Sequence, residues 1–246
     1  MLGSALNISE PNVVLNTAVA EALKQIADIL EAADDFDSAV HDIVKRVYSN
    51  HKKIIFNGDG YSDEWQKEAA KRGLPNFKTV PDAIPHLKDE KNIKLFTDHK
   101  IYTEQEVVSR AEIMFTNYCK TISHEAYIMS DMVKRQILPA VQNYIAELSS
   151  NALNKKALGI SALAYESDTL RELSENADKL YKATLDLDKA ANKLPKGDTE
   201  KVACHYRDKV CPLMKKVREY ADILETITAD EYWPFPTYKD LLYGVN

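Results

Sequence analysis

The residues most capable of chemistry lie in one stretch, Lys53–Trp65, with the sequence KIIFNGDGYSDEW. A short apolar run there meets two glycines and several carboxylates just before a predicted helix. Glycines let a backbone approach a ligand closely, while carboxylates bind divalent metals and helix-start amides bind phosphates. The stretch is therefore the first candidate for a phosphate-binding or metal-binding loop.

Spacing tests three loops of this kind. A P-loop has a lysine directly after its second glycine, whereas the first lysine after Gly60 is Lys67. A calcium loop needs an oxygen ligand and then a glycine where this stretch has Tyr61 and Ser62. A dinucleotide-binding fingerprint would need a third glycine three residues after Gly60. The spacing favours a structural interpretation, and an enzyme that uses the loop 57–65 stays a third alternative.

In that structural interpretation, Ile54–Phe56 form a short buried strand or extended run, and Asn57–Gly60 turn the chain. Ser62 then caps a helix that ends at Gly73, because serine accepts from helix-start amides and glycine tolerates a left-handed backbone.

The histidines and cysteines are also poorly spaced for metal binding. No histidine has a glutamate three residues before it, as the di-iron helical bundles require. Cys204 and Cys211 are two helical turns apart, too far to share one zinc ion, and Cys119 and His124 do not coincide on a helix surface. We predict no catalytic, cofactor-binding or metal-binding residue in this chain.

Composition narrows the class of protein further. The chain has 246 residues, a net charge of −6 and three cysteines. An acidic protein without clustered lysine and arginine is a poor binder of nucleic acid, and no apolar run approaches the length of a membrane span. An odd number of cysteines and an N-terminus without signal-peptide features indicate a reducing, cytoplasmic location.

Helical periodicity extends over most of the chain. Apolar residues predict a first helix over 13–31 and a second helix after the acidic break Asp34–Asp35. Residues 51–102 are rich in glycine and proline, which predicts an irregular connector with short helices and a domain seam there. Thr103–Glu106 form a capping box that opens a long helix, and Pro139 predicts a kink in it.

Two further helices carry the clearest periodicity. Leu170–Leu194 and Ala203–Ile227 repeat apolar residues at steps of three and four, and only Pro195–Asp198 separates them. A short break predicts an antiparallel hairpin, and Pro212 predicts a local bend in the second helix. We therefore predict a mostly all-α fold with an elongated antiparallel helical bundle over 103–229.

The tail, residues 230–246, is rich in aromatic residues and proline. We predict an extended segment that packs its rings back on a neighbouring surface. The candidate packing or interface residues are Trp65, Trp233, Phe235 and Tyr238.

Five blocks in order are similar to the C-terminal region of type III glutamine synthetases. These blocks are Ile8–Glu21, Ile54–Trp65, Lys71–Asn76, Lys134–Ala140 and Glu231–Tyr238. The resemblance covers essentially the whole chain and implies that residues 1–50 are the last helices of the catalytic domain. It also implies a longer parent whose upstream barrel binds ATP and Mg²⁺, and no residue here matches a metal or nucleotide ligand of the family.

The resemblance implies a parent that forms glutamine from glutamate, ammonia and ATP and assembles as stacked hexameric rings. The expected partners of this chain are thus the rest of the synthetase and other subunits. By itself we expect it to have a structural, assembly or regulatory role without activity. The alternative is an independent helical adaptor that binds a partner through its tail or bundle face.

Overall fold

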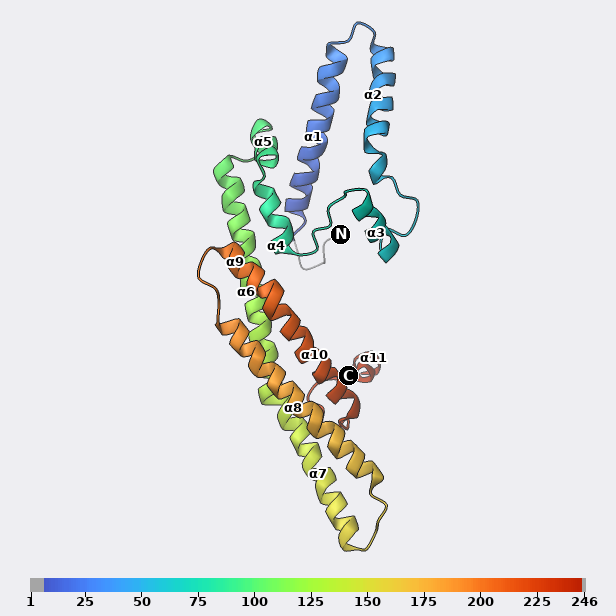
Figure 1. The fold of residues 1–246 in the computed structure, drawn as a ribbon, viewed down its shortest axis with the longest axis vertical. Coiled ribbons are helices and arrows are strands. Elements are labelled where there is room, and N and C mark those ends of the chain that lie inside the picture. Colours follow the sequence, from blue (N-terminus) through green and yellow to red (C-terminus); the bar gives the residue numbers. More distant parts are fainter. Residues whose placement is uncertain (1–6, 245–246) are drawn as a thin grey trace. The chain divides into compact units, whose positions relative to one another are not determined.

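The structure is a computed structural model that describes residues 7–244, apart from the side chains of Tyr238 and Lys239. Helices make up 78% of it, and no strand occurs among the described residues (Figure 1). The predicted all-α class is confirmed. The chain divides into two compact units, Met1–Met114 and Phe115–Asn246.

The first unit contains the helices before α6 and also the first turns of α6, up to Met114. In chain order they are α1 (Ser9–Glu31), α2 (Phe36–His51), the 3₁₀ turn η1 (Lys52–Ile54), α3 (Asp63–Lys71), α4 (Val80–Ala83), the 3₁₀ turn η2 (Ile84–Lys88) and α5 (Glu90–Asp98). The second unit contains the bundle. After α6 (Glu104–Met132) come the π-helical turn η3 (Val133–Ile137), α7 (Leu138–Ala157), α8 (Ala164–Asn192), α9 (Thr199–His205), the π-helical turn η4 (Tyr206–Val210), α10 (Cys211–Ile227) and α11 (Tyr238–Tyr243).

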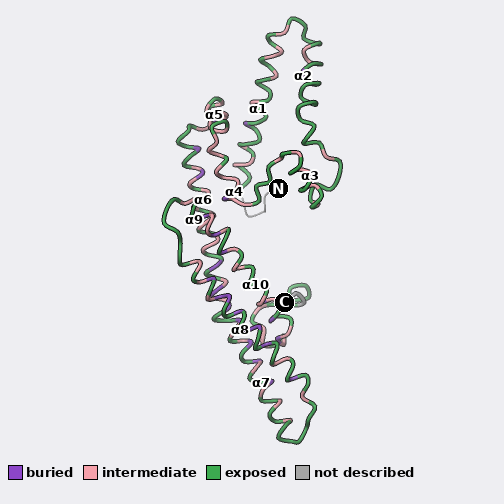
Figure 2. The backbone as a smooth tube through the Cα atoms, in the orientation of Figure 1, coloured by how far each residue is buried: buried purple, intermediate pink, exposed green. Residues whose placement is uncertain are grey.

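Helices α1 and α2 form an antiparallel hairpin (Figure 1). The Asp35 carboxylate begins α2 by accepting from the Ser38 amide at 3.2 Å, as an N-cap residue does. The only buried residue of α1 is Thr17, and the only one of α2 is Ile43. Most of the hairpin surface is consequently exposed (Figure 2).

The predicted long helix is present and continues over 54 residues, from Glu104 to Ala157. Its capping box is confirmed, because the Thr103 amide donates to Glu106 at 2.7 Å and the Glu106 amide donates to the Thr103 hydroxyl at 3.3 Å. Two of the four orphan amides at the helix start are satisfied in this way.

Proline shapes two helices through π-helical turns. At Pro139 and Pro212 the missing N–H cannot bond the carbonyl four residues earlier. In each case the helix widens just before the proline, where the amide of Leu138 bonds the carbonyl of Val133 and the amide of Cys211 bonds that of Tyr206. A wide turn thus lies just before each proline, a known adjustment of helices to local disruption, and the kink at Pro139 and the bend at Pro212 stay predictions.

The core of the second unit lies where α7 and α10 pack antiparallel against α8 (Figure 1). The buried apolar residues of α8 are spaced at steps of three and four, as predicted: Leu173, Ala177, Leu180, Ala183 and Leu187. Leu194 was expected to continue this stripe, but α8 ends at Asn192 and Leu194 is exposed in the loop before Pro195. Asp198 then caps α9.

Two local predictions were wrong. Ile54–Phe56 form no buried strand: a 3₁₀ turn ends at Ile54, and Ile54 and Ile55 are exposed, although Ile55 has the extended backbone of the alternative extended run. The tail is not extended throughout, because Thr237 and Asp240 form a second capping box that begins α11.

Candidate functional site: the exposed face of helix α1

The stretch 57–65 is organised by its own hydrogen bonds. The Asp59 carboxylate accepts from the Tyr61 amide at 2.9 Å, and the Ser62 hydroxyl donates to the Asp59 carbonyl at 2.8 Å. The same hydroxyl oxygen accepts from the Trp65 amide at 3.2 Å, which caps α3. These hydrogen bonds use the Asp59 carboxylate and the Tyr61 and Trp65 amides within the turn, and the predicted turn and helix cap are confirmed.

Trp65 fixes this turn to the rest of the first unit. Its ring stacks on Phe56 at 4.3 Å between centroids, and the Arg72 guanidinium lies 5.6 Å from the ring centroid. Arg72 also donates to the carbonyl of Ile55 at 2.8 Å and to Glu68 at 2.7 Å. The indole therefore serves as a packing platform inside this chain.

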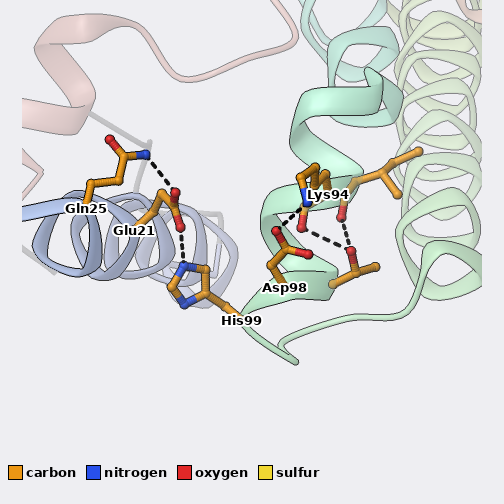
Figure 3. Close-up of polar contacts among 7 residues, drawn as sticks. Glu21, Gln25, Lys94, Asp98 and His99 are labelled. Atoms are coloured by element: carbon orange, nitrogen blue, oxygen red, sulfur yellow. Dashed lines mark hydrogen bonds and ion pairs between the residues drawn. The ribbon is translucent and has the colours of Figure 1, made fainter. Parts of the chain in front are cut away.

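Two ionic contacts attach α1 to the helices that follow it in the first unit. Arg110 on α6 pairs with Glu10, and His99 after α5 lies 2.7 Å from Glu21 (Figure 3). Because an ionised carboxylate only accepts, the Nε2 atom of His99 is the donor. The Arg110 guanidinium also lies over the Tyr102 ring at 4.2 Å. These contacts fix one side of α1.

The Glu21 carboxylate is the centre of this polar group. It accepts from the Gln25 amide at 2.7 Å as well as from His99, and these two hydrogen bonds lower the pKa of Glu21 (Figure 3). Lys94 and Asp98 form a separate pair at 2.8 Å on α5. Hydrogen bonds to a charged form favour that form, so Glu21 is held as a carboxylate.

The opposite side of α1 is an exposed apolar stripe. Leu15, Val19 and Leu23 are spaced four residues apart, and their exposed fractions are 63%, 56% and 61%. Residues with this spacing share one helix face. A contiguous exposed apolar face is characteristic of a surface that another protein segment covers. We call this set the α1 stripe.

Of the four packing residues predicted from the sequence, Trp65 lies in the first unit and the other three lie in the tail of the second unit. Trp233 and Phe235 pack against the bundle core, with their rings 6.2 Å apart. The Tyr238 side chain lies outside the described residues. Next to Trp233, the Tyr232 ring lies 5.3 Å from Tyr144 on α7.

Tyrosines strengthen this end of the bundle. The hydroxyls of Tyr144 and Tyr165 are 3.0 Å apart, and this hydrogen bond, together with burial, raises the pKa of Tyr144 to about 12. Tyr232 donates to Glu147 on α7. The tail is therefore joined to α7 by both ring packing and hydrogen bonding.

The remaining titratable groups do not assemble a metal site in the described part of the chain. Within residues 7–244, no three or more His, Cys, Asp or Glu side chains could hold an ion together. Burial raises the pKa values of Cys119 and Cys211, which keeps these thiols protonated. No described helix is both long enough and apolar enough to cross a bilayer.

A wide, open pocket of about 1010 Å³ lies within the second unit between α6, α8 and α9. Its polar lining includes Lys120, His124, Asp188 and Asn192. Asp188 accepts from Ser130 at 2.6 Å and pairs with Lys134, so its charge is already compensated.

Sequence reasoning missed the polar attachments of α1. Glu10 and Arg110 are 100 residues apart, and Glu21 and His99 are 78 apart, so no local pattern connects them. It did predict the helix over 13–31 from apolar residues at helical spacing.

Comparison with known proteins assigns this helical region to a class. Residues 39–156 match the family described as the glutamine synthetase C-terminal domain. The chain is 35% identical to a glutamine synthetase of Butyrivibrio fibrisolvens over 87% of its length, and 29% identical to one of Bacteroides fragilis over 98%.

A third relative defines the branch of that class. The chain is 34% identical over 98% of its length to the type-3 glutamine synthetase of Dictyostelium discoideum. The chain belongs to the type III glutamine synthetase family and corresponds to the C-terminal region of its members. It spans about a third of the length of the curated relatives it matches, with shares of 31% and 34%.

Proposed function

We propose that this chain is the helical part of a cytoplasmic glutamine synthetase and that it supports the structure and assembly of the enzyme. In this proposal the reaction, an ATP-dependent and Mg²⁺-dependent ligation of glutamate and ammonia, depends on the remainder of the synthetase. The curated relatives are about three times as long as the matched region, which leaves room for that remainder.

The α1 stripe is the observation that carries the proposal. Leu15, Val19 and Leu23 are exposed, while Glu10 and Glu21 on the other side of α1 are bound to the first unit. Burying three such side chains would contribute several kcal/mol, at about 1.5–3 kcal/mol each. We infer that the catalytic part of the synthetase covers this stripe, so that residues 1–50 are the last helices of the catalytic domain.

No metal site of this chain enters the proposal; among residues 7–244 no three or more His, Cys, Asp or Glu side chains are grouped so that they could hold an ion. The domain limits proposed for the chain are 1–50 for those helices, 51–102 for a connector, 103–229 for the bundle and 230–246 for the tail. Ring assembly with further subunits is the remaining part of the proposal.

A chimera tests the role directly. The segment of the Dictyostelium type-3 glutamine synthetase that aligns with this chain would be replaced by these 246 residues, and turnover would be measured with ATP, Mg²⁺, glutamate and ammonia. We expect an active chimera and no turnover by the isolated 246 residues. Turnover by the isolated chain would overturn the proposal.

A matched pair of variants tests the α1 stripe. Val19→Glu in the chimera places a charge in the stripe and is expected to abolish assembly and activity. Ala20→Glu adds the same charge one position away, about 100° around the helix, and is expected to keep both. Equal behaviour of the two variants would exclude the α1 stripe as the covered surface.

A further inference from the structure

The α1–α2 hairpin carries its charge in two separate segments. Residues 28–37 contain five acids and no lysine or arginine, whereas residues 43–58 contain four lysines or arginines and no acid. The acids are Asp28, Glu31, Asp34, Asp35 and Asp37, and the cations are Lys45, Arg46, Lys52 and Lys53. All nine side chains are exposed, and within the described part of the chain none of them forms an ion pair.

Helix α2 connects the two charged segments with an apolar stripe of its own. Phe36, Val44, Val47 and Tyr48 are exposed, with fractions of 60%, 57%, 42% and 65%. Their positions fall on one face when each residue advances about 100° around the helix. Ile43, the buried residue of α2, lies at the edge of this face. We call the four exposed residues the α2 stripe.

The arrangement is complementary to itself. Asp37 and His51 lie at the two ends of α2, about 21 Å apart at 1.5 Å per residue, and Val44 is midway between them. If a second α2 lies antiparallel across Val44, residue 37 of one chain faces residue 51 of the other. The acidic end of each helix then meets the basic end of the other, and the apolar residues meet at the centre.

We propose that the α2 stripe binds a second copy of this chain around a two-fold axis through Val44. An interface of this kind uses the same patch on both subunits, and therefore requires a self-complementary patch. Asp37 pairs with His51 and Lys52 of the partner subunit, and the same pairs repeat on the other side of the axis. Tyr48 packs beside Val40 of the partner subunit.

Self-complementary charge is what selects a second copy as the occupant. A partner with one sign of charge along its whole contact would be repelled at one end of α2, so a different partner would need a two-signed pattern of its own that matches both ends. The contact rests on and deepens the subunit assembly in the proposed function, because it assigns that assembly to the α2 stripe, a different surface from the α1 stripe that the remainder of the synthetase covers.

Sedimentation equilibrium of the 246-residue chain tests the proposal. We expect a concentration-dependent dimer that weakens as salt is added, because exposed ion pairs are screened. Val44→Glu places two like charges across the axis and is expected to weaken dimerisation by about a hundredfold. Val19→Glu, on the α1 stripe, is the matched control and is expected to leave the dimer unchanged. Circular dichroism checks that each variant keeps its helices.

Charge reversal provides a second, independent arm. Asp37→Lys and Lys52→Glu are each expected to weaken dimerisation about tenfold, because each change faces like charges across the interface. The double variant Asp37→Lys/Lys52→Glu exchanges the signs and is expected to restore it. The proposal is overturned by a wild-type chain that stays monomeric at all concentrations, by a dimer insensitive to Val44→Glu, or by a double variant that does not recover. None of these outcomes depends on the activity of the chimera.

Discussion

Leu180 in the middle of α8 is the most direct test of the bundle core. It is fully buried and belongs to the cluster formed by α7, α8 and α10. Leu180→Ala removes three carbon atoms, and at about 0.8 kcal/mol for each the transfer cost is about 2.4 kcal/mol. The cavity left behind brings the expected loss to about 3–4 kcal/mol. The substitution should therefore lower the melting temperature of the second unit by roughly 10–15 °C.

The chain offers a selective probe and a matched control for this experiment. It contains two tryptophans, and Trp65→Phe leaves Trp233 as the fluorescent reporter of the second unit. Leu153→Ala makes the same chemical change at a side chain that is 68% exposed, so its cost should stay below about 0.5 kcal/mol. Urea unfolding that gave Leu180→Ala and Leu153→Ala the same stability would refute this assignment of the core.

Three further predictions concern local features. Glu166 is buried and pairs with Lys155, and this hydrogen bond lowers the pKa of Glu166. The pair therefore stabilises the folded chain at pH values above the unfolded pKa of the carboxyl group, near 4.3. This stabilisation is lost as the pH falls through the lower pKa of the folded state. Glu166→Gln should therefore lower the melting temperature at neutral pH and flatten its acid-side decline, and a decline as steep as that of wild type would contradict this. Thr103→Ala should cost about 1 kcal/mol and speed amide hydrogen exchange in the first turn of α6; unchanged exchange there would show that the capping box is dispensable. Gly73 has a φ of +68°, so Gly73→Ala should cost about 1–2 kcal/mol in thermal unfolding, whereas equal stability would mean that the turn relaxes.

Most helices could be predicted because their signals are local. The N-caps Asp35 and Ser62, the capping box at Thr103 and the break before Asp198 all act over three or four residues. The periodicity of α8 and α10 reflects burial of one face, which the sequence records directly. The same local spacing predicted the turn and helix cap at 57–65, and the structure contains their hydrogen bonds.

The errors occurred where burial could not be read from composition. Ile54 and Ile55 look like a buried strand, but both side chains are exposed, and the Ile55 backbone bonds the 3₁₀ turn and the Arg72 side chain instead of a neighbouring strand. Leu194 continued an apolar repeat, but the helix had already ended at Asn192. The capping box at Thr237 was missed because the surrounding prolines and aromatic residues suggested an extended tail.

The sequence by itself determined the all-α class, the positions of the main helices and the family resemblance. These properties depend on backbone chemistry and on periodicity over a few residues. Only the tertiary structure decided which apolar faces are used within the chain. It shows that the apolar face of α8 is buried, while the similar faces of α1 and α2 stay exposed. It also shows that Glu10 and Glu21 attach α1 through Arg110 and His99, because contacts between distant residues arise only when the chain has folded.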